Sequence, residues 1–270
     1  MKMDKVLGLG LLGAVMCMNL TSCDKEEGFG PSFMNGKLLI SIEDEFSDSE
    51  GITAFEYNGN GRLSEIHDKY VCPTQNRSEI HHYKYVWYGD ESITVTCTYE
   101  DEPKYSTQTN IELKDGKIAS YEDKDETAKC FYDKGNRLVK IETVYKYNGE
   151  KDAFTFRWSG DNMCYISEGI GHEDYGVTLT YHKNLNGPYL FYKAIAYAGV
   201  MNSELYYLVS AHPELIGKQS KNAIASIRAM EEGREDEYVT IDYEFGKSSV
   251  IVRDTGRDKE DYWYSTMKWR

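Results

Sequence analysis

The stretch YNGNGRLSEI at residues 57–66 decides the fold of this chain, and it returns in similar form as YDKGNRLVKI at residues 132–141. In both copies an Arg, a Leu and an Ile follow the Tyr at the same offsets. Gly and Asn adopt the positive φ of a tight hairpin turn, so each copy predicts a strand that ends at the Tyr and another that begins at the Arg-Leu pair. Weaker copies at residues 113–118 and 158–163 have uneven spacing, which predicts a meander of hairpins and not a strict solenoid.

Period-two alternation surrounds these turns. Leu38, Ile40 and Ile42 alternate with polar neighbours, which predicts one apolar strand face, and the same pattern runs through residues 239–245. The 23 Tyr outnumber the 9 Phe, which suits a pleated surface where rings pack and hydroxyls stay wet. We therefore predict a mainly β protein: an antiparallel meander, strongly curved or closed into a barrel-like sheet, because curling protects edge strands.

One segment, residues 192–211, breaks the strand pattern. It is dense in apolar side chains, and we expect a short helical segment there. Asn202 and Ser203 can cap a helix that continues to Ala211, and Pro213 would stop it. The simplest role is to cover an open end or face of the sheet and to supply core. The alternative is a lid or a surface for docking a partner.

The N-terminal residues predict where the protein is located in the cell. Lys2 and Lys5 precede an uncharged apolar run, too short for the ~20 residues of a membrane span. The run ends at Thr21-Ser22-Cys23, which resembles the lipobox of bacterial lipoproteins. The resemblance implies that residues 1–22 are a signal peptide and that Cys23 is lipidated, palmitate being an expected acyl group. Residues 23–36 then form a lipidated flexible tether, and residues 37–270 a single β domain.

A wider resemblance follows from these motifs. The hairpin phrases resemble the tyrosine–aspartate repeats of large β-shell proteins. Together with the lipobox and LIGKQSKN at residues 215–222, they resemble a surface lipoprotein family of Gram-negative gut anaerobes. That family is known only as a domain of unknown function with a porin-like β fold. Ala223 and Ile224 depart from its usual Leu-Pro pair. The acidic residues 24–27 resemble a surface-export tag, so the resemblance implies the outer membrane and the cell surface, and it implies no activity.

Charge excludes several kinds of partner. The formal net charge is −14, and removal of residues 1–22, with two Lys and one Asp, makes it −15. Such a charge repels nucleic acid phosphates and anionic headgroups. We expect no nucleic-acid partner, and membrane contact only through the lipid anchor.

Four cysteines remain beyond the leader and Cys23: Cys72, Cys97, Cys130 and Cys164. In an exported protein they could form two disulfides, with three possible connectivities. The slightly favoured alternative is that they are single buried thiols on strands. They lack CxxC spacing, so a cysteine zinc site is not expected.

The sequence offers no catalytic or metal motif. A GxSxG elbow, a phosphate-binding loop in the mature chain, HExxH and the calcium-loop pattern are all missing. His81 and His82 are adjacent on a predicted strand, so they point to opposite faces and cannot easily share one ion. We expect no catalytic residue, no metal and no cofactor.

Aromatic residues give the candidate binding surface. Tyr83, Tyr85 and Trp87 alternate along one strand, and Phe156 and Trp158 do so along another. Such rings can stack on sugars, which predicts a non-enzymatic module for a glycan or protein ligand. The alternative is a cross-strand ladder that only packs the sheet.

Two further classes remain open. One is a structural or assembly lipoprotein that docks another outer-membrane component. The other is a membrane-spanning barrel, against which stand the lipid anchor and the charges on both faces of several predicted strands, because a lipid-facing Lys or Arg costs ~2–4 kcal/mol at the bilayer midplane.

Overall fold

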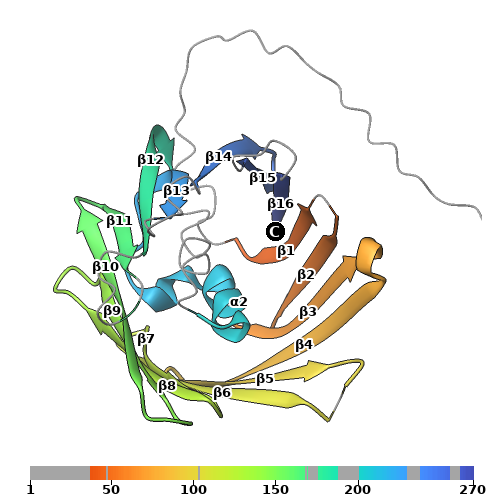
Figure 1. Ribbon diagram of the computed structural model, residues 1–270, viewed down its shortest axis with the longest axis vertical. Coiled ribbons are helices and arrows are strands. Elements are labelled where there is room, and N and C mark those ends of the chain that lie inside the picture. Colours follow the sequence, from red (N-terminus) through yellow and green to blue (C-terminus); the bar gives the residue numbers. More distant parts are fainter. Residues whose placement is uncertain are drawn as a thin grey trace, which may run out of the picture.

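The computed structural model describes residues 37–46, 48–102, 104–167, 169, 176–187, 201–229, 238–255 and 262–270. Sixteen strands in these ranges form one closed antiparallel barrel (Figure 1), which confirms the predicted fold class. The strands are β1 (Leu39–Phe46), β2 (Glu50–Tyr57), β3 (Leu63–Cys72), β4 (Arg77–Tyr88), β5 (Ser92–Tyr99), β6 (Ser106–Lys114), β7 (Lys117–Glu122), β8 (Glu126–Tyr132), β9 (Leu138–Tyr145), β10 (Lys151–Ser159), β11 (Asn162–Ser167), β12 (Gly176–Asn186), β13 (Asn222–Ala229), β14 (Tyr238–Phe245), β15 (Ser249–Thr255) and β16 (Tyr262–Trp269). The predicted signal peptide, Cys23 and the tether lie outside the described residues.

The barrel is a meander that closes on itself. Each strand pairs with the next one in the chain, and β1 pairs with β16 from Leu39↔Trp269 to Phe46↔Trp263. Two backbone hydrogen bonds join Leu38 and Arg270 at 3.1 and 3.0 Å, so the first and last strands meet at the same end. Closure gives each of the sixteen described strands a paired neighbour on both sides, which is the advantage expected of curling.

The first strand corrects one detail of the sequence pattern. Leu39 and Ile42 enter the core, whereas Leu38 and Ile40 are only half-buried. The register of β1 against β16 shifts between Leu39 and Ser41, and an irregularity of this kind breaks strict period-two alternation. The prediction for residues 239–245 is confirmed: Ile241 is buried, and Tyr243 and Phe245 pack against the core.

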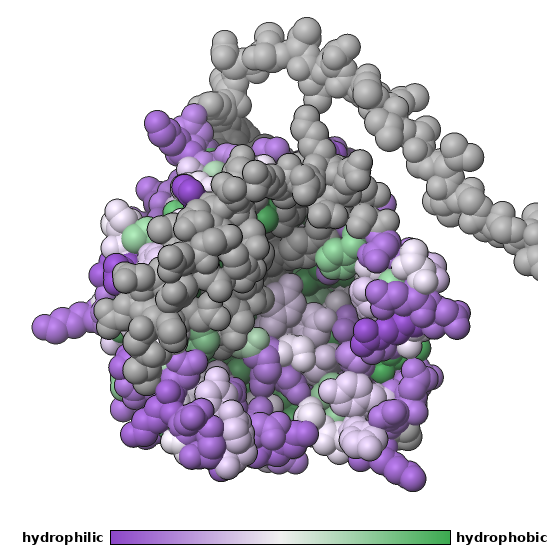
Figure 2. Space-filling view, viewed as in Figure 1, coloured by the Kyte–Doolittle hydropathy of each residue, from purple (hydrophilic) through white to green (hydrophobic). Residues whose placement is uncertain are grey.

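The core lies inside the barrel. On β5, the side chains of Ile93, Val95 and Cys97 point inward and are buried, and the Thr residues between them face outward. Outward side chains elsewhere form ion pairs: Lys268–Glu43, Lys140–Glu142 and Arg253–Glu244. Figure 2 shows a mainly hydrophilic outline. Apolar side chains thus fill the inside of the barrel, and charged side chains stand on its outside.

A helix occupies the interior. α2 (Ser203–Ala211) lies within the ring of strands in Figure 1, and Leu205, Leu208 and Val209 are fully buried. The Asn202 side chain accepts a hydrogen bond from the Leu205 amide at 3.1 Å, as a cap should, and a 3-10 turn, η3 (Pro213–Ile216), follows the helix. This confirms the predicted helix over its described part, since residues 192–200 lie outside. In the described part of the chain, no helix is long and apolar enough to cross a membrane.

Aromatic side chains join paired strands at one end of the barrel, the end that carries the β2–β3, β4–β5, β8–β9 and β10–β11 turns. Each donates a hydrogen bond to a carbonyl near the start of the preceding strand. The pairs are Tyr57–Leu39, Trp87–Leu63, Tyr132–Ile118, Trp158–Leu138, Tyr181–Met163 and Tyr243–Ile224. Only residues with a ring and a polar donor can fill core space and make this bond, which gives a physical reason for the excess of Tyr over Phe.

The two copies of the hairpin phrase form matching turns at this end. Asn58 Oδ1 accepts from the Asn60 and Arg62 amides, and Asp133 Oδ1 accepts from the Gly135 and Arg137 amides. Each Arg lies over an indole ring: Arg62 over Trp87 at 5.0 Å and Arg137 over Trp158 at 5.8 Å. The repeated sequence thus encodes a repeated turn.

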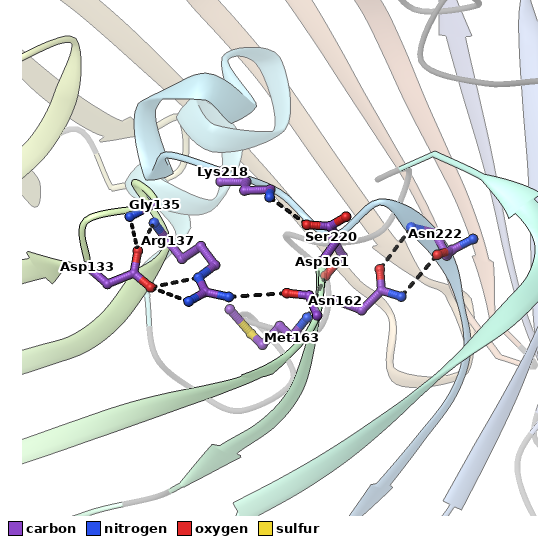
Figure 3. A network of polar contacts seen from close by, with 10 residues as sticks. Asp133, Gly135, Arg137, Asp161, Asn162, Met163, Lys218, Ser220 and Asn222 are labelled. Carbon is purple, nitrogen blue, oxygen red and sulfur yellow. Dashed lines mark hydrogen bonds and ion pairs between the residues drawn. The ribbon is translucent and has the colours of Figure 1, made fainter.

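The segment that follows the helix is fastened to the second of these turns and to the neighbouring β10–β11 turn (Figure 3). Lys218 donates its amide to Asn136 O at 2.7 Å and its ammonium to Asp161 at 2.7 Å. Ser220 accepts from the Met163 amide at 3.0 Å. We call this end, with residues 212–222 fastened to its turns, the clasped end. The opposite end carries the β3–β4 and β5–β6 connections, through residues 73–76 and 100–105.

The four cysteines Cys72, Cys97, Cys130 and Cys164 are free thiols. Cys72 and Cys97 are buried, and the other two are half-buried. The structure therefore has the single-thiol arrangement and no disulfide among these four.

Candidate functional site

The aromatic residues of β4 that we predicted to bind a ligand lie inside the barrel. Tyr83 and Tyr85 are buried, the Tyr83 ring centroid lies 5.3 Å from that of Tyr207, and the Tyr85 hydroxyl donates to Glu204 O at 3.0 Å. Burial raises the pKa of both phenols well above the ordinary value. These two rings pack the strand against α2.

The remaining three predicted residues are also held in packing contacts. Phe156 is buried, and the indole nitrogens of Trp87 and Trp158 donate to backbone carbonyls at 2.8 and 2.9 Å. The two sets stand on different strands, β4 and β10, and the structure does not bring them together. The expected sugar-binding face is thus not exposed, because the inward curvature places these rings in the core.

A pocket opens at the end of the barrel opposite the clasped end. Its volume is about 490 Å³, and its walls come from the start of β4, with the turn before it, and from the end of β5. Its lining residues are Asn76, Arg77, Ser78, Glu79, Ile80, His81, Tyr99, Asp101 and Glu102. The turn is tight because Asn76 adopts φ 50°, a left-handed conformation that Asn tolerates. We call this the β4–β5 pocket.

His81 and Tyr99 form one wall of the β4–β5 pocket. They are directly paired across β4 and β5, and their ring centroids lie 4.8 Å apart at 72°. His81 Nδ1 lies 3.7 Å from Asp68 Oδ2, a charge contact longer than a hydrogen bond. Asp68 accepts from the Thr53 hydroxyl at 2.8 Å, and burial raises its pKa above the ordinary 3.8, although Thr53 and Tyr207 oppose the shift as hydrogen-bond donors.

Arg77 and Glu79 form a second wall of the β4–β5 pocket. Arg77 Nε donates to Glu79 Oε1 at 2.8 Å, and this contact raises the pKa of the guanidinium. Both side chains remain partly exposed, so their other donors and acceptors can reach a ligand. Planar polar groups beside an aromatic ring can bind a polyhydroxylated molecule, through hydrogen bonds to hydroxyls and ring contact with C–H groups.

Sequence reasoning missed the residues of the β4–β5 pocket. A usable signal was present, because Arg77, Glu79 and His81 share the strand parity of Tyr83. The partners Asp68 and Tyr99 depend on the register of β3 and β5 against β4, and a single sequence does not give that register.

The outer wall carries a separate cluster of ionisable side chains. Glu56, Glu65 and His67 have ligand-type atoms within 4.8 Å of one another, and His82 contacts His67. His82 faces outward and His81 inward, as expected for neighbours on a strand. The sequence indicated no metal motif, and it is the pairing of β2 with β3 and of β3 with β4 that assembles this group.

Comparison with known proteins shows the fold and no activity. No protein-family model matches this chain, and no curated protein matches it. Among solved structures, a porin-like protein from Bacteroides uniformis matches with a TM-score of 0.58 and 17% sequence identity. The match covers 86% of this chain and 97% of that one. The chain thus shares a porin-like β-barrel fold.

Proposed function

We propose that this protein is a non-enzymatic binding module of the bacterial outer membrane, held at the cell surface by lipid on Cys23. Its ligand site is the β4–β5 pocket, and its ligand is a glycan. The porin-like neighbour supports an envelope location. The lipobox-like leader, residues 1–23, supports anchoring by acyl chains.

The two faces of the barrel support a tethered module over a spanning pore. A spanning barrel presents apolar side chains to lipid and a polar interior. Here Lys140, Glu142 and Lys268 stand on the outer face, while the interior is filled by apolar side chains and α2. Lys129 stands exposed at the middle of β8, directly opposite Glu142 on β9, where a spanning barrel would place it in the bilayer core at a cost of ~2–4 kcal/mol.

The observation that carries the proposal is the composition of the β4–β5 pocket. Its volume of about 490 Å³ lies in the range of small-ligand sites. Tyr99 offers a ring, and Arg77, Glu79 and Asn76 offer planar hydrogen-bonding groups, the pairing that sugars require. Catalysis would need a positioned nucleophile or acid–base pair, and the sequence carries no motif for one.

A protein partner is the second candidate, because exposed aromatic residues stand at the pocket end of the barrel. Tyr105 is 67% exposed beside β6, and Tyr147 is 77% exposed between β9 and β10. Aromatic residues are enriched at protein interfaces. A docking role at this end, as part of an outer-membrane assembly, would use these two side chains and not the pocket.

A glycan array with the full-length protein in detergent tests the first candidate. Tyr99→Ala and Arg77→Ala should each weaken binding at least tenfold, whereas Tyr88→Ala, an exposed Tyr at the clasped end, should change nothing. Binding that survives in both pocket variants would refute the pocket assignment. Copurification that depends on Tyr105 and Tyr147 would favour the protein partner.

Location needs its own test. Protease added to intact cells should digest the protein if it stands on the outer surface. Protection until the outer membrane is broken would contradict surface exposure, and native mass spectrometry that finds an unmodified Cys23 would contradict the anchor.

A further inference from the structure

We propose that Glu56, Glu65 and His67 form a binding site for a divalent transition-metal ion such as Zn²⁺ on the outer wall of the barrel, and that His82 orients His67. The site is independent of the β4–β5 pocket, because its side chains point away from the interior.

Strand register brings the four side chains together. Glu56 on β2 is directly opposite Glu65 on β3, and His67 on β3 is directly opposite His82 on β4. Glu65 and His67 are two residues apart on one strand, so they share its outer face. Three neighbouring strands thus contribute to one patch.

The distances fit a metal after small movements. His67 Nε2 lies 3.6 Å from Glu56 Oε1 and 3.9 Å from Glu65 Oε2. A tetrahedral ion with bonds of ~2.0–2.1 Å separates its ligand atoms by roughly 3.3 Å. The three ligand atoms all lie within 4.8 Å of one another, so each pair has to approach by no more than ~1.5 Å to reach this spacing. The carboxylate side chains are 62% and 47% exposed, so they can move by this amount without disturbing the core.

The contact between the two histidines matches the second-shell pattern of metal sites. The Nδ1 atoms of His67 and His82 lie 2.8 Å apart, so one must carry the proton and the other must accept it. When His67 donates, its Nε2 is left with a lone pair directed toward Glu56 and Glu65. A ligating His usually donates its other ring N–H in this way.

The two facing carboxylates, Glu56 and Glu65, repel each other and would attract a cation. Like charges directly opposite on paired strands destabilise a sheet, and the facing pair Glu56 and Glu65 is such a case. A divalent ion offsets this repulsion and satisfies the imidazole lone pair. An imidazole nitrogen favours Zn²⁺, Ni²⁺ or Cu²⁺ over Mg²⁺ and Ca²⁺, which prefer oxygen ligands alone. Three protein ligands leave a position for water.

Calorimetric titration with ZnCl₂ tests the site. The full-length protein, without a polyhistidine tag and freed of metal by a chelator, should bind Zn²⁺ at neutral pH, and millimolar Mg²⁺ should not compete. His67→Ala and Glu65→Gln should each weaken binding at least tenfold, and His82→Ala should weaken it about tenfold, the range for a residue that orients a ligand. Circular dichroism checks that the variants fold.

Two matched controls define the outcome. Glu142→Gln removes a carboxylate from the outer face of β9, and His81→Ala removes the neighbouring imidazole that faces inward. Both should bind Zn²⁺ like the unaltered protein. Absence of Zn²⁺ binding, or binding that is unchanged in His67→Ala, overturns the proposal and leaves His67 as a histidine that pairs with the two carboxylates only when protonated.

Discussion

Replacing Gly217 by Ala should release the segment that fastens the clasped end. Gly217 has φ 79° and ψ −144°, a backbone region open essentially to Gly, which costs another residue about 1–3 kcal/mol. An added Cβ would lie 2.3 Å from Asn136 O, a backbone atom that cannot rotate away. The resulting shift would break the 2.7 Å hydrogen bond from Lys218 N to the same oxygen, at about 1 kcal/mol. We expect a total loss of about 3 kcal/mol.

Gly160→Ala is the matched control for this loss. Gly160 also has a positive φ, 59°, but a Cβ there would meet nothing within 4 Å, so only backbone strain of roughly 1 kcal/mol applies. Urea unfolding gives the free energy of each variant, and amide hydrogen exchange of residues 213–222 reports detachment of the segment alone. Equal stability and equal exchange in the two variants would refute the reasoning.

Three further predictions concern the core, a buried acid and the thiols. Leu208→Ala empties a fully buried position of α2 and should cost about 3–5 kcal/mol by chemical denaturation; a loss below 1 kcal/mol would mean that the helix is not core. Burial raises the pKa of Asp68 in the folded state, so this group lowers the free energy of unfolding as pH rises from about 3.8 through the folded-state pKa. In thermal melts across this pH range, Asp68→Asn should reduce the loss of stability with rising pH. An unchanged pH dependence in the variant would contradict this prediction. Burial also raises the pKa of Cys97 to about 11, so Cys97 should resist a thiol reagent at pH 8 until the protein is denatured; Cys72, Cys97, Cys130 and Cys164 should then all react without reductant, and a missing thiol would reveal a disulfide.

Much of the fold follows from local sequence signals. The turn residues of the two hairpin phrases predict the β2–β3 and β8–β9 connections, and Asn202 with Pro213 predicts the bounds of α2. Closure is different, because it rests on contacts between the two ends of the chain. Lys268 reaches Glu43 and Ser265 reaches Asp44, across more than 200 residues, and no local pattern encodes such pairs.

The candidate sites were harder to predict for the same reason. Alternation correctly indicates that Tyr83, Tyr85 and Trp87 share a face, but only curvature determines that this face is the inside. Likewise, His67 meets Glu56 only because β2 and β3 pair in one register. A slip of one residue would place these groups on opposite faces and remove the cluster.

The meeting of Leu38 and Arg270 at the clasped end also sets where a lipid anchor on Cys23 would be joined to the barrel. A fatty anchor on Cys23 would be joined to the clasped end by the 13 intervening residues, 24–36, which span at most about 45 Å. The β4–β5 pocket, with Tyr99 and Arg77, lies at the other end of the barrel, so an anchor at the clasped end would leave it accessible to molecules in the surroundings.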